Sequence, residues 1–168
     1  MKLFLAGLFI FGIPAYYLIR IRRKAKKKKK KHLQLCLAYD RLVKQVRFVV
    51  QHSELLKSKI IALDRRNKKL LIIDRNHREK QEECISLLGI ENCRVIEIKY
   101  SSNSCIKKIF LELKSKWNNK ITRFCFYDDS YDLITELPAL AKSAKLWKHR
   151  IDLHKYPGSV GLQLDYVL

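Results

Sequence analysis

Acidic residues are missing from the first 39 positions of this 168-residue chain, and glycine, proline and closely spaced cysteines are scarce throughout. The five glycines form no phosphate-binding loop, and no two cysteines have the C-x-x-C spacing of many metal and redox sites. None of the five histidines follows the H-E-x-x-H pattern of zinc hydrolases. From these absences we expect no catalytic residue, no metal ion and no cofactor, and an enzyme is the least favoured functional class.

Two other groups of residues were weighed as metal or disulfide sites. Asp128, Asp129 and Asp132 form an acidic cluster, but it lacks the twelve-residue calcium pattern and is typical of turns and helix starts. The cysteines are odd in number and widely spaced, unlike a disulfide framework. We expect buried, reduced thiols that behave as small apolar side chains, in agreement with a cytoplasmic location. They are Cys36, Cys84, Cys93, Cys105 and Cys125.

The chain begins with an apolar run. Leu3 to Ile19 contains 17 residues without a charge, which as a helix rise about 26 Å, a little under the hydrocarbon thickness of a bilayer. Lys2 and Arg20 can extend their charged groups to the interface and cover the shortfall. We therefore expect a transmembrane anchor at residues 1–20. The alternatives are an uncleaved helix on the membrane surface and a cleaved signal peptide, which is disfavoured because one cation precedes the apolar run and ten follow it.

A polybasic juxtamembrane segment at residues 21–32 follows this anchor, and ten of the twelve residues from 20 to 31 are Lys or Arg. Since cations flanking a span stay on the cytoplasmic side, we expect a single-pass cell-membrane protein with its N-terminus outside and its C-terminal domain cytoplasmic. The segment should also attract anionic lipid of the bilayer. Because no aromatic residue interleaves these cations for base stacking, we expect no nucleic-acid partner. The predicted headgroup contacts are Arg20, Arg22, Arg23, Lys24, Lys26, Lys27, Lys28, Lys29, Lys30 and Lys31.

The rest of the chain is only moderately basic. Residues 32–168 hold 25 Lys and Arg against 16 Asp and Glu, so more than half of the net charge of +20 belongs to the N-terminal residues. Residues 33–58 contain no Gly or Pro and place apolar side chains at steps of three, four and seven, which predicts a connector helix. Its apolar stripe is expected to pack on the following domain or, as the less favoured alternative, to form a short coiled coil.

From position 59 the apolar period changes to two, which favours strands. The segments 60–63 and 70–73 flank a polar turn in which Asn67 is expected to take the left-handed conformation. Further alternating runs follow, and Trp117-Asn118-Asn119-Lys120 is a strong hairpin turn. We expect five or six strands, and they should be antiparallel because their connections are too short for crossovers.

An amphipathic helix is expected after the strands. One helical face would carry apolar residues from Leu133 through Trp147 to Ile151, with Pro138 in the first turn, where a missing amide costs nothing. The helix should run to about position 153, followed by a C-terminal tail at residues 154–168. Residues 59–153 would therefore form one antiparallel domain.

Four stretches carry a resemblance to a known fold. They are the hairpin IIALDRRNKKLLIID, the strand ENCRVIEIKY, the hairpin around WNNK and the helix ELPALAKSAKLWKHRI. Successive hairpins and one closing helix resemble the pleckstrin-homology-like (PH-like) superfold, and in particular small bacterial domains of that type behind a membrane anchor. The resemblance covers residues 59–153. It implies an α+β fold in which an antiparallel curled sheet is closed by the C-terminal helix, and a binding module without catalytic residues.

Two functions follow as the leading interpretations. In the first, a membrane-anchored protein presents its small cytoplasmic PH-like domain to a protein partner or to anionic lipid. In the second, the protein is a structural accessory subunit of a membrane complex that acts through its transmembrane and connector helices, with no ligand site. A pocket with convergent polar groups would favour the first function, and an exposed apolar patch on the connector helix would favour the second.

Overall fold

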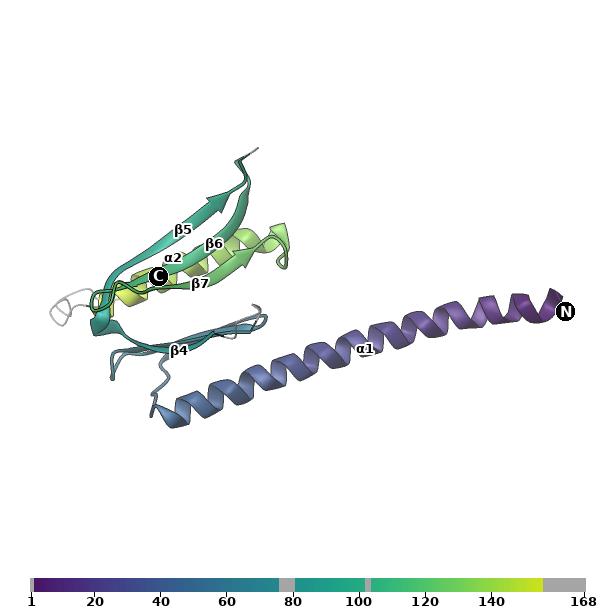
Figure 1. Ribbon diagram of the computed structural model, residues 1–168, viewed down its shortest axis with the longest axis horizontal. Coiled ribbons are helices and arrows are strands. Elements are labelled where there is room, and N and C mark those ends of the chain that lie inside the picture. Colours follow the sequence, from purple (N-terminus) through teal and green to yellow (C-terminus); the bar gives the residue numbers. More distant parts are fainter. Residues whose placement is uncertain (1, 76–80, 102–103, 156–168) are drawn as a thin grey trace, which may run out of the picture.

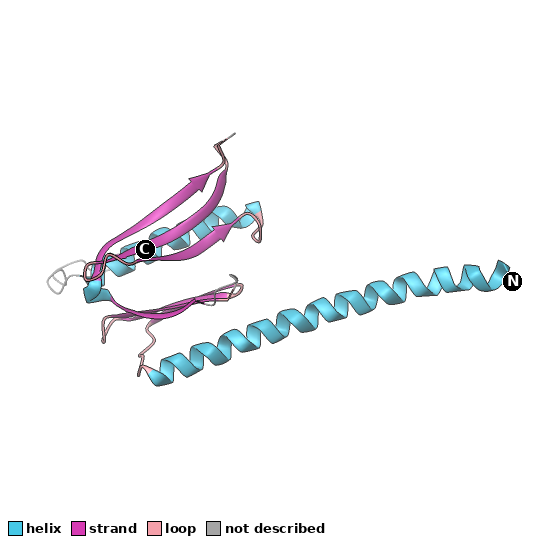
Figure 2. Cartoon of the chain, in the orientation of Figure 1, coloured by secondary structure: helices cyan, strands magenta, loops and turns pink. Residues whose placement is uncertain are grey.

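The computed structural model describes residues 2–75, 81–101 and 104–155, with the backbone alone at residues 2–19, 24, 25, 28 and 31. A long helix, a four-stranded sheet, a three-stranded sheet and a second long helix follow one another along the chain (Figures 1 and 2). The first helix projects away from the body, and only its C-terminal part packs against it.

Helix α1 (Lys2–Gln45) is continuous through the predicted anchor, the polybasic segment and the first part of the predicted connector. Among the residues described with their side chains, no helix is both long and apolar enough to cross a membrane. The side chains of residues 2–19, on which the predicted span falls, lie outside that description. The expected fold class, with a transmembrane helix and a separate connector helix, is therefore wrong, because the single helix α1 covers both regions.

The predicted connector ends about three and a half turns early, at a Schellman cap. Arg47 has a left-handed backbone with φ of 49°. The amide of Phe48 donates to the carbonyl of Val43, and the amide of Arg47 donates to that of Lys44. Phe48 is buried beside the last turn, which supplies the apolar contact typical of this cap. Residues 52–56, expected in the helix, form a strand instead because they pair along their whole length with the next strand.

The described residues contain seven strands in two separate antiparallel sheets, so the expected single curled sheet is also wrong. The chain leaves the first sheet at the short 3-10 helix η1 (Leu87–Gly89), whose Leu87 is fully buried. The first sheet has the order β1 (His52–Leu56), β2 (Lys59–Asp64), β3 (Lys69–Asp74), β4 (Gln81–Ser86). The second has the order β5 (Ile90–Lys99), β6 (Ile106–Ser115), β7 (Ile121–Asp128).

The β2–β3 turn lies where it was expected but uses a different left-handed residue. Lys68, and not Asn67, has a positive φ of 52°. The two carboxylate oxygens of Asp64 accept hydrogen bonds from the backbone amide and the side-chain amide of Asn67, at 2.8 and 2.7 Å. These bonds hold Asn67 in an Asx turn and move the left-handed position one residue on. In the second predicted hairpin turn, Asn119 has a φ of 54° between β6 and β7.

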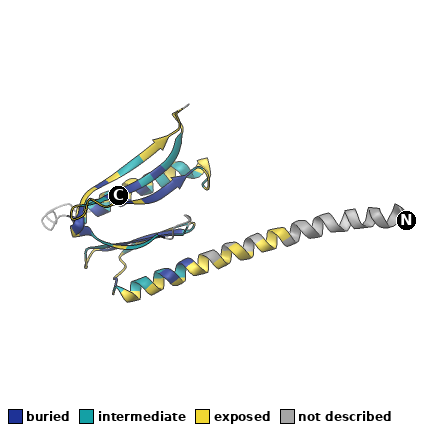
Figure 3. Cartoon of the chain, in the orientation of Figure 1, coloured by how far each residue is buried: buried dark blue, intermediate teal, exposed yellow. Residues whose placement is uncertain are grey.

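The two central strands of the first sheet, β2 and β3, are buried on both faces (Figure 3). One face joins the second sheet and helix α2 in the main core and contributes Ile61, Leu63, Leu70 and Ile72. The opposite face packs under the end of α1 in a smaller core made of Leu35, Phe48, Ile60, Ala62, Leu71 and Ile73. The last turns of α1 therefore pack on the domain, as in the favoured interpretation of the connector.

Helix α2 (Leu137–Lys155) confirms the expected C-terminal amphipathic helix, with Pro138 in its first turn. Ala144, Trp147 and Ile151 are fully buried in the main core. Leu133 was expected on the same face but precedes the helix and is 66% exposed. The body is an α+β domain with antiparallel sheets, an arrangement loosely compatible with a PH-like fold.

Candidate binding surfaces

The predicted headgroup contacts lie on the part of α1 that projects beyond the body (Figure 3). Every one of them whose side chain the structure describes is exposed, and none of these is ion-paired within the described residues. The seven are Arg20, Arg22, Arg23, Lys26, Lys27, Lys29 and Lys30. The side chains of Lys24, Lys28 and Lys31 lie outside the description. Since a helix turn contains 3.6 residues, these cations cover about three turns on all sides.

A second surface is a pocket of about 410 Å³ in the body. The β1–β2 hairpin, strand β7 and the first turns of α2 enclose it, and its walls are mostly apolar. The apolar lining consists of Leu55, Leu56, Phe126, Ala139 and Leu140. The volume lies within the range of small-ligand and side-chain sites, and the lining also includes Lys59 and, at the rim, Lys57, Asp132 and Glu136.

Lys57 organises that rim. Its ammonium donates to Asp132 at 2.8 Å and to Glu136 at 2.6 Å, and thereby ties the β1–β2 turn to the start of α2. Burial disfavours the charge on Lys57, but the hydrogen bonds to Asp132 and Glu136 outweigh it and raise the pKa of the ammonium. Lys57 lowers the pKa of Glu136 in turn, helped by the amide of Leu133. Lys57 and Glu136 therefore stay ionised and paired with each other at neutral pH.

An exposed apolar loop borders the pocket. Tyr131, Leu133 and Ile134 are 64–70% exposed, and Leu55 on the opposite rim is 49% exposed. The loop is ordered by Asp128, whose carbonyl accepts from the amides of Tyr131 and Asp132. The amide of Asp128 in turn donates a hydrogen bond to the carboxylate of Asp132 at 2.8 Å. The acidic cluster of the sequence thus shapes a turn, as expected, and no group of three metal-binding side chains occurs in the described part of the chain.

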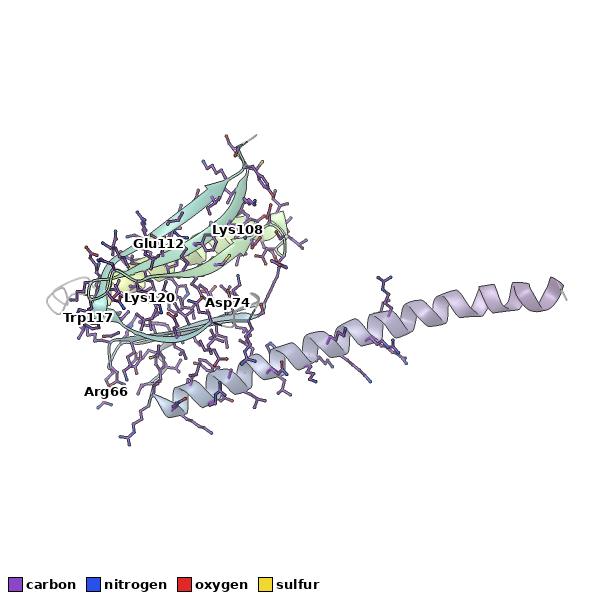
Figure 4. All side chains as sticks on the ribbon, in the orientation of Figure 1. Arg66, Asp74, Lys108, Glu112, Trp117 and Lys120 are labelled. Carbon is purple, nitrogen blue, oxygen red and sulfur yellow. The ribbon has the colours of Figure 1, made fainter. Side chains whose placement is uncertain are left out.

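A third charged group spans the second sheet at Glu112 (Figure 4). Arg94 and Arg123, on the strands to either side, donate to its two oxygens at 2.8 Å each. Only 3% of the Glu112 side chain is exposed. The hydrogen bond from Arg123, opposed by burial and reinforced by Arg94, lowers the pKa of this carboxyl. Because every oxygen is occupied, we assign the group to cross-strand stabilisation and not to ligand binding.

The thiols agree only in part with the expectation of buried cysteines. Cys93 and Cys125 are buried, and burial raises the pKa of Cys93 to about 12, so this thiol is inert. Cys84 and Cys105 are exposed, and Cys36 is half-buried. None of the five, all of which lie in the described residues, forms a disulfide.

Sequence reasoning missed the pocket because its members are far apart in the chain. Lys57 and Asp132 are separated by 75 positions, and no local pattern marks either as a partner of the other. The one local signal was the cluster of apolar residues Tyr131, Leu133 and Ile134, of which Leu133 resembled the start of the helical stripe. Comparison of the chain with family models, with curated proteins and with solved structures finds no match.

Proposed function

We propose that this chain is a PH-like binding protein. Its cationic segment, residues 20–31 of α1, holds it at an anionic membrane surface, and the body binds a protein partner. The succession of a four-stranded sheet, a three-stranded sheet and a C-terminal helix supports the PH-like assignment. The location at a cell membrane and the cytoplasmic side of the body stay predictions from the charge bias of the sequence.

The exposure of the cationic segment carries the proposal. The first acidic residue of the chain is Asp40, so no carboxylate lies within about 13 Å along the helix from Lys31. Uncompensated charges of one sign raise the local potential and attract counter-charges, and anionic lipid contributes about 1 kcal/mol per cation near its surface. Seven exposed cations that bind nothing in the described chain are therefore available to a membrane.

The pocket supports the protein partner. Its apolar walls and the exposed side chains of Tyr131, Leu133 and Ile134 together form a surface with an apolar centre and a charged rim. Protein interfaces have this anatomy, and an aromatic or aliphatic anchor side chain would fill a pocket of this size.

A small exposed apolar patch on α1 favours the alternative function as an accessory subunit. Leu33 and Leu37 lie one turn apart on α1 and are 60% and 59% exposed. Stable interfaces bury about 800 Å² on each partner, which two leucines do not supply. We therefore keep the binding-protein function as the conclusion.

Vesicle binding by the full chain tests the membrane part. Replacing Lys26, Lys27, Lys29 and Lys30 by Gln should remove about 4 kcal/mol of attraction, so the ratio of affinities for anionic and neutral vesicles should fall at least about a hundredfold. Taking the ratio of the two affinities removes the contribution of apolar residues, which is the same for both kinds of vesicle. It should also fall with salt and be equal for two headgroups of equal charge.

The matched control removes the same charge from the body. Lys99, Lys116, Lys142 and Lys145 are exposed, and their replacement by Gln should change the ratio by less than about threefold, since they are scattered among acids. Equal losses in the two quadruple variants would refute the segment as the membrane contact. A strong preference for one headgroup at high salt would mean that the body, and not the cationic segment, recognises the lipid.

A further inference from the structure

Two imidazole nitrogens in the body are buried without a hydrogen-bond partner. They are Nε2 of His52 at the start of β1 and Nε2 of His154 near the end of α2. Within the described residues, only Ser58 Oγ and Arg75 Nε share that condition. An unsatisfied buried polar group costs about 1–3 kcal/mol, so such groups in native proteins call for a water, an ion or a ligand.

The packing of β1 on α2 brings the two histidines to one corner. Glu54 of β1 accepts hydrogen bonds from Ser143 and Trp147 of α2. His52 lies two residues before Glu54, on the same face of the strand. His154 lies two turns after Trp147, on the same side of the helix. Both imidazoles therefore lie at the end of the β1–α2 contact, beside the β2–β3 turn.

Burial and the positive charges of three basic side chains lower the pKa of His52 and His154. Burial lowers the pKa of His52, and Arg65 and Arg150 lower it further. Burial likewise lowers the pKa of His154, and Arg65, Lys68 and His52 add to the effect. The guanidinium of Arg150 is held at 5.2 Å from the centre of the Trp147 ring, which fixes its position. At pH 7 the corner thus contains two neutral imidazoles beside three cations.

The acids of the same elements are engaged elsewhere. Glu54 faces the middle of α2, as described above. Asp64 accepts from the amide of Val49 at 2.8 Å and from the β2–β3 turn. Asp152 pairs with Lys148 at 2.6 Å. The corner keeps three cations and two imidazole nitrogens without a partner, which suits an anion, whereas the three cations would repel a divalent metal ion.

We propose that this corner, formed by His52, His154, Arg65, Lys68 and Arg150, binds the phosphate group of a small soluble phosphate monoester. Guanidinium groups match phosphate oxygens through paired N–H donors, and each imidazole supplies one further donor. The end of α2 lies on the side of the body away from the N-terminus of α1 (Figure 1). A ligand in solution can reach that side while α1 contacts a membrane, so we favour a soluble source over a lipid headgroup.

Histidine proton resonances of the full chain, titrated with pH in inorganic phosphate at constant ionic strength, test the corner. Bound phosphate should raise the pKa of His52 and His154. The exposed His149 serves as the internal reference for the resonances. Arg65→Met should weaken phosphate binding at least about tenfold, and Arg65→Lys less. Arg66→Met is the matched control, because Arg66 is the exposed neighbour of Arg65 in the same turn, and it should change binding less than about twofold.

Three results would overturn the proposal. They are unchanged titration of both histidines in phosphate, equal losses in Arg65→Met and Arg66→Met, and perturbation of both histidines by Zn²⁺ but not by phosphate. Vesicles separate the sources of the phosphate. With the α1 quadruple Gln variant, vesicles containing phosphatidic acid should bind no better than vesicles of equal charge without a phosphomonoester. A preference that Arg65→Met removes would support the phosphate site but assign its ligand to the membrane.

Discussion

Glu54 is expected to hold helix α2 on the first sheet, and its removal is the sharpest test of how the body closes. The carboxylate accepts from Ser143 Oγ at 2.6 and 2.7 Å and from Trp147 Nε1 at 2.5 Å. Trp147 is fully buried, so its indole N–H loses its protein acceptor when Glu54 is removed. Hydrogen bonds to charged groups contribute about 1.5–3 kcal/mol, and a buried orphan donor costs about 1–3 kcal/mol.

Glu54→Ala should therefore lower the free energy of unfolding by about 2–4 kcal/mol, with part of the loss at Ser143 recovered by hydration. Glu54→Gln keeps an acceptor oxygen and loses only the charge, so we expect a loss of about 1 kcal/mol. Urea unfolding of the full chain, followed by circular dichroism in all variants, measures these differences.

A double-mutant cycle isolates the bond to the indole. Trp147→Phe removes the N–H while keeping an aromatic ring in the core. In that background Glu54→Ala should cost about 1–2 kcal/mol less than in the parent, which is the coupling energy of the pair. A coupling energy near zero, or a Glu54→Ala variant as stable as the parent, would refute the assignment of Glu54 as the link between β1 and α2.

Two further predictions concern the core and the second sheet. Trp147→Ala should cost about 3–5 kcal/mol because it empties a fully buried site between the sheets and α2, and an unchanged melting temperature would contradict the observed closure. The lowered pKa of Glu112 means that its ion pairs add stability above the unfolded pKa of about 4.3 and lose it as pH falls through the lower folded value. Glu112→Gln should therefore be less stable than the parent at pH 7, and the difference should shrink below about pH 4; a constant difference would refute this cause.

The parts of the fold that could be predicted are those determined by neighbours in sequence. The β2–β3 and β6–β7 hairpins follow from alternating apolar residues around polar turns, and α2 follows from its apolar stripe with Pro138 at the start. Strand β1 could not be predicted, because the helical stripe of α1 continues into its residues. The strand forms through pairing with β2, a partner that the local pattern does not reveal.

The binding surfaces also divide into one that neighbours in sequence form and two that residues far apart in sequence form. The cationic segment is contiguous, so its composition predicted it. The pocket instead joins the β1–β2 hairpin, β7 and the start of α2, and the histidine corner joins β1, the β2–β3 turn and α2. Lys57 meets Asp132 and Glu136 only after both sheets and α2 have assembled. Even Asn67, a strong local signal, was assigned the wrong role, because the carboxylate of Asp64 holds it and shifts the left-handed position to Lys68.

The burial of β2 and β3 on both faces fixes how these surfaces are placed relative to one another. Because β2 and β3 pack against α1 on one face and against the main core on the other, the direction of α1 is set relative to the body. The loop between β7 and α2, which borders the pocket, lies on the side toward which α1 projects, and the end of α2 lies on the opposite side (Figure 1). A membrane bound by the cationic segment would therefore lie on the pocket side and leave the histidine corner open to solution. A partner at the pocket and a phosphate ligand at the corner would not compete for space, and their binding should be additive unless α2 itself moves.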